Sequence, residues 1–372
     1  SSATPSLESY ARAYKGVYRL IEMKARINQR PLPEVEVVDM KECLRCGGNA
    51  MLSPSLMEAL DGCLRRGEQA ILLLNRRGYT PVLRCLSCGE VLKCPHCEVA
   101  LSYHKQENCL KCHVCGYSRT LPGHCPTCGA NDWRSLGMGT QRLEEYVQHC
   151  FPQARIVRMD ADTTRAKGAH ETLLEQFSKD ADILLGTQMI AKGLDYARVT
   201  LVGILNADAM LNRGDYRCSE LTYDLLEQAC GRSGRGERSG RVILQAYDCA
   251  HYAVRCAAAH DYEGFFRREM QFRHLAQYPP YAYLSAVVLH HRNAQTVRED
   301  ALAARETLSG GAFKVLGPIE LGRLRDECRW RLILKGKDRH EQAAALRRLA
   351  QAHRMQKRRS RLEIDVDLMM LE

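Results

Sequence analysis

Cysteine pairs in the middle of the chain are the residues whose type and spacing imply chemistry most directly. In each pair two residues separate the cysteines, so that one turn can present two thiolates to a single tetrahedral ion. The four pairs are Cys85/Cys88, Cys94/Cys97, Cys112/Cys115 and Cys125/Cys128. Gly89, Gly116 and Gly129 directly follow second cysteines, where such a turn commonly needs a positive φ. Eight thiolates predict two closed zinc sites of four cysteines each, which fold the segment and leave no position open for catalysis.

Spacing alone leaves open which pairs share an ion. A redox-active C-x-x-C would be one reactive pair beside a βαβ unit, so four consecutive pairs disfavour that role. The further pair Cys43/Cys46 and the single Cys109 are interpreted as incidental free thiols. Nearby histidines could each replace a sulfur but are interpreted as solvated, because the cysteines already complete two sites. They are His96, His104, His113 and His124.

Two further segments suit phosphate chemistry. Residues 228–236 close a predicted helix and carry Arg232 and Arg235, whose planar, permanently charged guanidinium groups suit a developing phosphoryl charge. Residues 186–195 form a polar loop at the carboxyl end of a predicted strand, the edge at which open α/β sheets bind ligands. We expect both segments to line one nucleotide pocket. The alternatives are a solvated basic turn and a helix cap.

Short apolar segments alternate with amphipathic segments over much of the chain. Strands are predicted over 69–74, 155–159, 182–185, 199–205 and 241–246. Helices are predicted over 55–66, 140–150, 170–178 and 219–230. Nearly all-apolar strands separated by helices predict an α/β fold, with a parallel sheet that helices cover on both faces. The cysteine-rich residues 85–133 interrupt this alternation as an insertion.

The pattern changes after a helical connection over 250–275 and the rigid turn Tyr278-Pro279-Pro280. The segments that follow alternate between strand and helix in the order βαββαβ. They are strand 283–290, helix 295–308, strands 313–316 and 330–335, helix 339–352 and strand 362–367. This order predicts a C-terminal α+β domain of the ferredoxin-like type.

Composition restricts the partner and the compartment. The formal net charge of +10 and the pI near 8.8 favour a polyanionic partner, because Lys and Arg that neutralise phosphates release counterions. The chain has no run of about 18 apolar residues, and its start lacks the pattern of a signal peptide. We therefore expect a cytoplasmic protein without a membrane span. In a reducing compartment, 18 cysteines indicate metal binding and not disulfides.

In their order along the chain, residues 186–195 and 228–236 resemble motifs V and VI of superfamily 2 helicases. Residues 2–6, Ser-Ala-Thr-Pro-Ser, resemble motif III of the same superfamily. Further segments make the chain similar to the PriA family of primosomal replication-restart helicases along essentially its whole length. They are Leu74-Asn75-Arg76-Arg77-Gly78-Tyr79, Gly137-Met138-Gly139-Thr140, Tyr278-Pro279-Pro280-Tyr281, Gly317-Pro318, Arg329-Trp330-Arg331 and Ile364-Asp365-Val366-Asp367.

The resemblance implies roles for individual residues. One zinc ion is expected on Cys85, Cys88, Cys125 and Cys128, and the other on the four middle cysteines. Arg232 and Arg235 are expected to act on the γ-phosphate of ATP bound with Mg²⁺, with Gln228 orienting by hydrogen bonding. Nucleotide contacts are expected from Gly186, Thr187, Gly193 and Asp195. DNA contacts are expected from Arg76, Arg77, Tyr79, Gln188 and Lys192.

The resemblance also sets an expected domain organisation. Members of the family carry a first motor lobe with a G-x-x-x-x-G-K-[ST] phosphate loop before motif III, and this sequence contains no such loop. We therefore expect residues 1–40 to be the tail of that lobe and a linker. A second RecA-like lobe is expected over 41–250, including the insertion 85–133, and a C-terminal domain over 251–372. Such a fragment is expected to hydrolyse no ATP by itself.

The implied function is ATP-dependent 3′–5′ unwinding at stalled forks and primosome assembly. The expected partners are forked or single-stranded DNA, single-strand DNA-binding protein and other primosome proteins. The protein is expected to be a monomer in the bacterial cytoplasm, associated with the nucleoid. The alternative from another class is a non-enzymatic, zinc-dependent adaptor that binds DNA or primosome proteins. A ribbon-bearing transcription or RNA factor is disfavoured, because it leaves the three helicase motifs unexplained.

Overall fold

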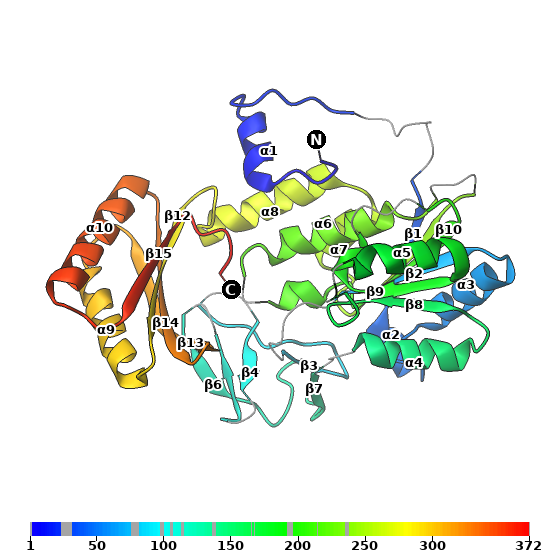
Figure 1. Cartoon of the computed structure of the whole chain (residues 1–372), viewed down its shortest axis with the longest axis horizontal. Coiled ribbons are helices and arrows are strands. Elements are labelled where there is room, and N and C mark those ends of the chain that lie inside the picture. The colour runs from blue at the N-terminus through cyan, green and yellow to red at the C-terminus, as the bar shows by residue number, and fades with distance from the viewer. Residues whose placement is uncertain are drawn as a thin grey trace.

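The computed structural model describes most of the chain, in ranges separated by short gaps. These are 2–23, 32–75, 82–96, 100–104, 107–112, 115–135, 139–164, 166, 168–191, 196–213, 215–234 and 238–371. Three parts are visible in Figure 1: a parallel sheet with its helices on the right, a small cysteine-rich module below, and an antiparallel sheet with two helices on the left.

A six-stranded parallel sheet forms the centre of the largest part. In spatial order its strands are β1 (Glu34–Asp39), β11 (Arg241–Ala246), β10 (Val199–Leu205), β2 (Gln69–Leu74), β9 (Ile183–Gly186) and β8 (Ile156–Met159). Every pairing in this order is parallel. All residues of β2 and β10 are buried, because a parallel sheet is covered by helices on both faces.

Alternate residues of the central strands belong to two separate cores, as the period of two in a strand requires. Ile71 and Leu73 lie in one core, and Leu72 and Leu74 lie in the other. The helices over the first core are α1 (Leu7–Tyr14), α5 (Ala169–Asp180), α6 (Cys218–Cys230), α7 (Tyr252–Ala258) and α8 (Tyr262–Ala276). The helices over the second core are α3 (Pro54–Arg65) and α4 (Thr140–Cys150). The predicted α/β fold is confirmed.

Residues 34–39 differ from the expected linker. They form β1, which pairs with β11 over six residues at the edge of the sheet. The short helix α2 (Met40–Arg45) follows directly, and the Asp39 side chain caps it by accepting from the Lys41 N–H. Pro33 suggested a break in structure, but the sequence Glu-Val-Glu-Val after it has the alternation of an edge strand.

The motif III-like segment lies against this part of the molecule. Ser6 ends the segment and caps α1 by accepting a hydrogen bond from the Ser9 N–H. The Leu7 N–H donates to Glu220 Oε1 of α6 at 3.2 Å, and the Tyr262 hydroxyl of α8 donates to the carbonyl oxygen of Pro5 at 2.6 Å. The start of the chain is therefore held by the two helices α6 and α8.

The cysteine-rich module is inserted between β2 and α4, as predicted. Its strands are β3 (Leu83–Cys85), β4 (Ser102–His104), β5 (Cys109–Lys111), β6 (Ser118–Thr120) and β7 (Trp133–Ser135). β3 pairs with β7, and β4, β5 and β6 form a separate three-stranded sheet. Strands of three residues bury little apolar surface, so a module of this kind needs another source of stability.

The C-terminal part is an antiparallel sheet with two helices on one side. Its elements are β12 (Tyr283–His291), α9 (Ala294–Thr307), β13 (Lys314–Leu324), β14 (Glu327–Gly336), α10 (Arg339–Met355) and β15 (Arg361–Val366). The spatial order β13-β14-β12-β15, with all pairs antiparallel, is that of a ferredoxin-like domain. The prediction is confirmed, although β13 extends well beyond the predicted residues 313–316.

A third apolar core joins the three parts. It contains Leu110 from the cysteine-rich module, Tyr216 from the segment before α6, and Leu284 and Leu371 from the C-terminal part. The Leu371 N–H also donates to the carboxylate of Asp215. None of the described helices is long and apolar enough to cross a membrane.

Candidate functional site

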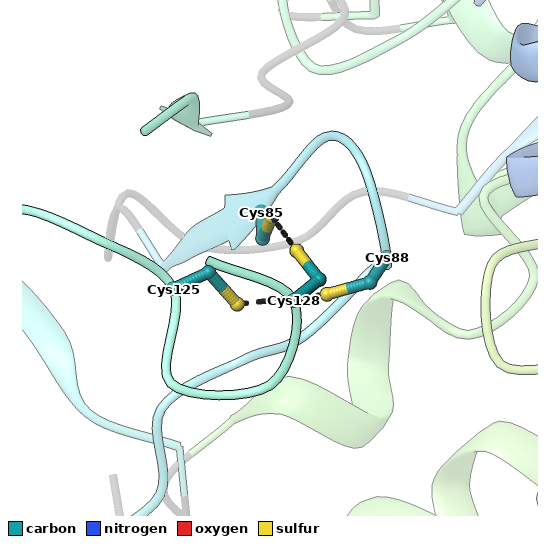
Figure 2. A group of neighbouring side chains, drawn as sticks. All are labelled: Cys85, Cys88, Cys125 and Cys128. Atoms are coloured by element: carbon teal, nitrogen blue, oxygen red, sulfur yellow. Dashed lines mark hydrogen bonds between the residues drawn. The ribbon is translucent and has the colours of Figure 1, made fainter. Parts of the chain in front are cut away.

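The sulfur atoms of Cys85, Cys88, Cys125 and Cys128 come together at one point of the module (Figure 2). The Cys85 and Cys128 sulfurs are 3.6 Å apart, and so are those of Cys88 and Cys125. A tetrahedral zinc ion with bonds of about 2.3 Å to sulfur needs sulfur atoms about 3.8 Å apart. The four sulfurs therefore fit a closed zinc site, grouped as the family resemblance implied.

The backbone of these turns has the geometry that the glycines predicted. Gly89, Gly116 and Gly129 have φ values of 77°, 80° and 74°. Their N–H groups donate to the carbonyl oxygens of the first cysteines of their turns, at distances of 2.9, 3.0 and 2.8 Å respectively. Because a side chain is strained at such φ values, glycine lets the chain fold back around each pair of sulfurs.

Burial and backbone amides shift the pKa values of the thiols of this cluster in opposite directions. Burial raises the pKa of Cys85 and raises the pKa of Cys88 to about 12. Burial also opposes ionisation of Cys125, but the N–H groups of Cys128 and Thr127 outweigh it and lower the pKa of Cys125 to about 7. Without a cation Cys85 and Cys88 therefore keep their protons, and metal binding must release them.

A second cluster contains Cys94, Cys112 and Cys115, and the sulfurs of Cys94 and Cys115 are 3.6 Å apart. The fourth expected ligand, Cys97, lies outside the described residues, as does His113. Within the described ranges neither metal cluster includes a histidine. The described donor atoms are thus all sulfur, which suits a structural zinc ion.

The loop after β9 lies at the carboxyl-terminal edge of the parallel sheet. Gly186 ends β9, and a Cβ atom there would lie 2.3 Å from the carbonyl oxygen of Met159, so no larger residue fits. The Thr187 N–H donates to the same oxygen at 3.3 Å. Gln188 Nε2 donates at 3.2 Å to Oδ1 of Asn75, the residue that follows β2. Three strand ends therefore meet here, although the sequence analysis assigned no individual role to Asn75.

The end of α6 lies at the opposite edge of the sheet. The Arg232 N–H donates to a carbonyl oxygen in the last turn of α6 at 3.0 Å. The Ser233 hydroxyl donates to the carbonyl oxygen of Thr200 at 2.8 Å, and the Gly234 N–H donates to that of Val199 at 3.2 Å. Val199 and Thr200 begin β10, so Arg232 lies near the amino-terminal edge.

The expectation of one pocket lined by Arg232 and by Gly186 is therefore corrected. Leu73 pairs with Gly186 on one side and with Ile204 on the other, and Val199 pairs with Gln69, four residues before Leu73. At about 3.3 Å per residue, that separates the two segments by about 13 Å along the strands. A helix that connects two parallel strands starts at the carboxyl edge and ends at the amino edge, which places the two segments apart.

Several expected site residues lie outside the described residues, and Gln228 is half-buried in the last turn of α6. The residues outside are Arg76, Arg77, Tyr79, Lys192, Gly193, Asp195 and Arg235. Their side chains stay predictions.

Arg84 and Asp208 fasten the cysteine-rich module to the carboxyl edge. Asp208 follows β10, is 1% exposed, and accepts hydrogen bonds from the N–H groups of Tyr247 and Asp248 at 3.2 Å each. It forms an ion pair of 2.8 Å with Arg84, the residue before the first metal ligand. The Arg84 guanidinium also lies 4.5 Å from the centre of the Tyr247 ring. Asp208 therefore caps strand ends and orients β3.

A buried cluster of charges joins α1, α6 and α8. Arg273 is 0% exposed and forms ion pairs with Glu220 at 2.7 Å, Glu269 at 3.0 Å and Glu8 at 2.9 Å. Burial alone would raise the pKa of Glu220, but Arg273 and Arg217 bring it below its usual value. Burial raises the pKa of Glu269 and outweighs the attraction of Arg273. Sequence patterns did not reveal this cluster, because Arg273 resembles a surface residue of an amphipathic helix.

A column of stacked side chains continues from Arg273 into the C-terminal part. The Arg273 guanidinium lies 5.2 Å from the centre of the Tyr216 ring, and that ring stacks on Tyr278 at 5.0 Å with 9° between the planes. Lys335 Nζ of β14 lies 3.7 Å from the centre of the Tyr278 ring. Two cations thus enclose two aromatic rings between α6 and the C-terminal sheet.

Three family descriptions match successive parts of this chain. "PriA DNA helicase Cys-rich region (CRR) domain" matches residues 94–119, and "Helicase conserved C-terminal domain" matches residues 135–237. "Primosomal protein N C-terminal domain" matches residues 274–369. The three matches follow the three parts of the fold.

Proteins named "Replication restart protein PriA" resemble the chain along nearly all of its length. The one from Bacillus subtilis is 44% identical over 99% of this chain and 46% of its own length. The one from Haemophilus influenzae is 34% identical over 98% of this chain and 50% of its own length. The chain spans about half the length of the curated relatives it matches. The yeast DEAD-box splicing factor Prp28 is similar over 66% of this chain and 39% of its own, with 11% identity and a TM-score of 0.29, too low to carry an argument.

Proposed function

The chain belongs to the PriA family of replication restart proteins, and from this premise we propose that it serves as the second motor lobe and C-terminal domain of a replication-restart DNA helicase. The observation that carries the proposal is the presence, in one chain, of a PriA cysteine-rich region, a helicase C-terminal domain and a PriA C-terminal domain. In this proposal the lobe begins with β1 and carries the insertion 85–133, and the second domain covers residues 251–372.

The two edges of the parallel sheet serve two ligands in this proposal. At the carboxyl edge, Thr187 and Gln188 bind the phosphates of one DNA strand through hydroxyl, amide and backbone donors. At the end of α6, Arg232 and Arg235 donate to the γ-phosphate of ATP that another part of the protein holds, and Gln228 orients them. Bound Mg²⁺ supplies the neutralising charge for phosphoryl transfer.

Residues 192–195, which include Gly193 and Asp195, couple the two ligands in this proposal. A change at the nucleotide therefore shifts the DNA contacts of Lys192 and Gln188. We also propose phosphate contacts and a stacking surface for an unpaired base at Arg76, Arg77 and Tyr79.

The two cysteine clusters hold two zinc ions in this proposal. The sulfur-only donor sets and the sulfur separations of 3.6 Å support it. The ions are structural, because four sulfurs close each site and leave no position for water or substrate.

The proposed partners are forked or single-stranded DNA, single-strand DNA-binding protein and other primosome proteins. The net charge of +10 supports the nucleic acid partner. We place the working protein, a monomer, in the bacterial cytoplasm at the nucleoid.

Arg232 provides the direct test of the motor role. The chain is joined in cis to the preceding half of a family member, and DNA-stimulated ATP hydrolysis is measured. We expect Arg232→Ala to lower kcat by about 10³-fold with DNA affinity retained, because an arginine donor to the transferred phosphate is typically worth that much or more. Arg198→Ala is the matched control, since Arg198 is exposed near the same edge and donates to the carbonyl oxygen of Ser178 at 2.7 Å.

The outcomes separate the two candidate functions. Unchanged turnover in Arg232→Ala would remove this residue from the nucleotide site. DNA binding without stimulated hydrolysis in the unaltered joined protein would instead favour the zinc-dependent adaptor. Equal losses in Arg232→Ala and Arg198→Ala would indicate a general disturbance of this edge.

A further inference from the structure

A fourth C-x-x-C-G turn lies outside both cysteine clusters. Cys43 is in the last turn of α2, Cys46 caps that helix, and Gly47 follows. Gly47 has a φ of 79°, and the glycines of the three described ligand turns have φ values of 74° to 80°. This turn therefore shares both the sequence and the glycine conformation of turns whose cysteines gather in metal clusters.

The chain folds closely around the Cys43 sulfur. A Cβ atom on Gly48 would lie 2.5 Å from Cys43 Sγ and 2.7 Å from the Cys43 carbonyl oxygen. The Gly48 N–H donates to that oxygen at 2.8 Å, one residue later than the equivalent bond in the ligand turns. Neither Gly47, because of its φ, nor Gly48, because of this contact, accommodates a side chain. The two glycines are what allow the turn to close over the sulfur.

The spacing of the two thiols suits a shared ligand. Residues three apart on a helix lie on the same face. Cys46 is exposed, Cys43 is half-buried, and neither forms a disulfide. Burial and the neighbouring Cys46 raise the pKa of Cys43, which makes it a poor redox nucleophile. Two neighbouring thiolates would repel each other, and a cation between the two sulfurs would offset this repulsion.

The turn lies beside the first cysteine cluster without belonging to it. Arg45 Nη2 donates at 3.4 Å to the carbonyl oxygen of Ser87, which lies between the ligands Cys85 and Cys88. A Cβ atom on Gly89 would lie 2.8 Å from Cδ of Lys41, so α2 packs directly on that ligand turn.

We propose that Cys43 and Cys46 form an accessory site for a thiophilic divalent cation such as Zn²⁺. Binding forms two metal–sulfur bonds and releases two thiol protons to solvent, and no electrons are transferred. Exchangeable ligands complete the coordination. With two protein sulfurs instead of four, the ion is held more weakly and exchanges faster than the ions of the closed clusters.

Zinc titration tests this proposal. The reduced chain is titrated with Zn²⁺ against a chromophoric chelator, and bound ions are counted by elemental analysis. We expect a binding event weaker than those of the clusters, abolished in the double variant Cys43→Ser/Cys46→Ser. It should persist in the control Cys109→Ser, because Cys109 is a half-buried cysteine outside both clusters that faces the Glu107 carboxylate at 3.7 Å.

Each outcome has a defined meaning. Half an ion per chain together with a doubled mass in light scattering supports the site, with the same pair on a second copy completing the coordination. Equal ion counts in the unaltered chain and the double variant overturn it. Unchanged thermal unfolding of the double variant shows that a lost event reflects lost ligands and not lost structure. The motor proposal does not depend on any of these results.

Discussion

At the scale of single residues, the cysteines link local geometry to metal chemistry. Cys85 and Cys88 meet Cys125 and Cys128 from a distant turn, with sulfurs 3.6 Å apart. Burial holds the Cys88 pKa at about 12, so that thiol does not ionise near neutral pH without a compensating charge. A zinc ion held by these four sulfurs would supply this charge, and its binding would then be coupled to the folding of the module.

Removing one sulfur tests whether the clusters bind metal separately. We expect Cys88→Ser to lose one zinc ion per chain from the first cluster and to keep the ion of the second, because the second uses other sulfurs. Elemental analysis after gel filtration measures the content, with Cys109→Ser as the unaffected control. Loss of both ions, or of neither, would contradict two independent sites.

At the scale of elements, α6 connects the buried charge cluster with the proposed nucleotide site. Glu220 lies in its first turn and binds Arg273, and Arg232 follows its last turn. The Leu7 N–H also donates to Glu220, so the helix is anchored at one end to the motif III-like segment. A rigid helix transmits a shift at one end to its other end. The contacts of Glu220 at the start of α6 therefore influence the position of Arg232 after its last turn.

The two buried glutamates are expected to respond differently to substitution. The folded-state pKa of Glu220 is lowered, so its ion pairs stabilise the fold above the unfolded value of about 4.3 and lose this effect as pH falls through the folded pKa. The pKa of Glu269 is raised, so its ionisation lowers stability as pH rises above about 4.3. We expect Glu220→Gln to cost about 3–5 kcal/mol at pH 7, because it leaves Arg273 short of a counter-charge.

Urea unfolding at pH 7 and pH 4 measures both free energies. Glu269→Gln is the matched control and should cost less at pH 7, since the amide oxygen can still accept from Arg273 while the amide NH2 group donates to the Tyr252 hydroxyl oxygen. The cost of Glu220→Gln should shrink at pH 4, where the carboxylate of the unfolded chain is protonated first. Equal costs for the two variants at pH 7 would refute this assignment of charge.

At the scale of the whole molecule, the cysteine-rich module, the motor lobe and the C-terminal domain are not independent. Leu110, Tyr216, Leu284 and Leu371 share one core, although they come from all three parts. The C-terminal domain also has a core of its own, which includes Val287 and Leu346. Destabilising the shared core should therefore release the C-terminal domain from the other two parts without unfolding it.

Zinc removal and Leu371→Ala should have the same effect on this shared core. Leu371 is 1% exposed, and truncating a buried leucine typically costs about 2–5 kcal/mol. We expect both changes to increase hydrogen exchange in β12, which contributes Leu284, while far-UV circular dichroism of the domain persists. Leu302→Ala is the control, since Leu302 is 44% exposed on α9. Unaltered exchange in β12 after chelation would show that the module does not support the domain.

The elements and turns that depend on neighbours along the chain were predictable from the sequence. Strand 69–74, helix 140–150 and the βαββαβ order are confirmed, because hydrophobic period and chain order are local properties. The ligand turns were predictable for the same reason, since two cysteines and a glycine form each one. β1 was not predicted, because the prolines before it suggested a linker and because its partner β11 lies some 200 residues later in the chain.

The contacts between distant groups became known from the three-dimensional structure. It placed Arg232 across the sheet from Thr187, since strand direction fixes the edge at which a connecting helix ends. It also buried Arg273 among glutamates of α1, α6 and α8, which local periodicity cannot reveal. Such contacts depend on the path of the chain through space, and no local pattern of residues encodes that path.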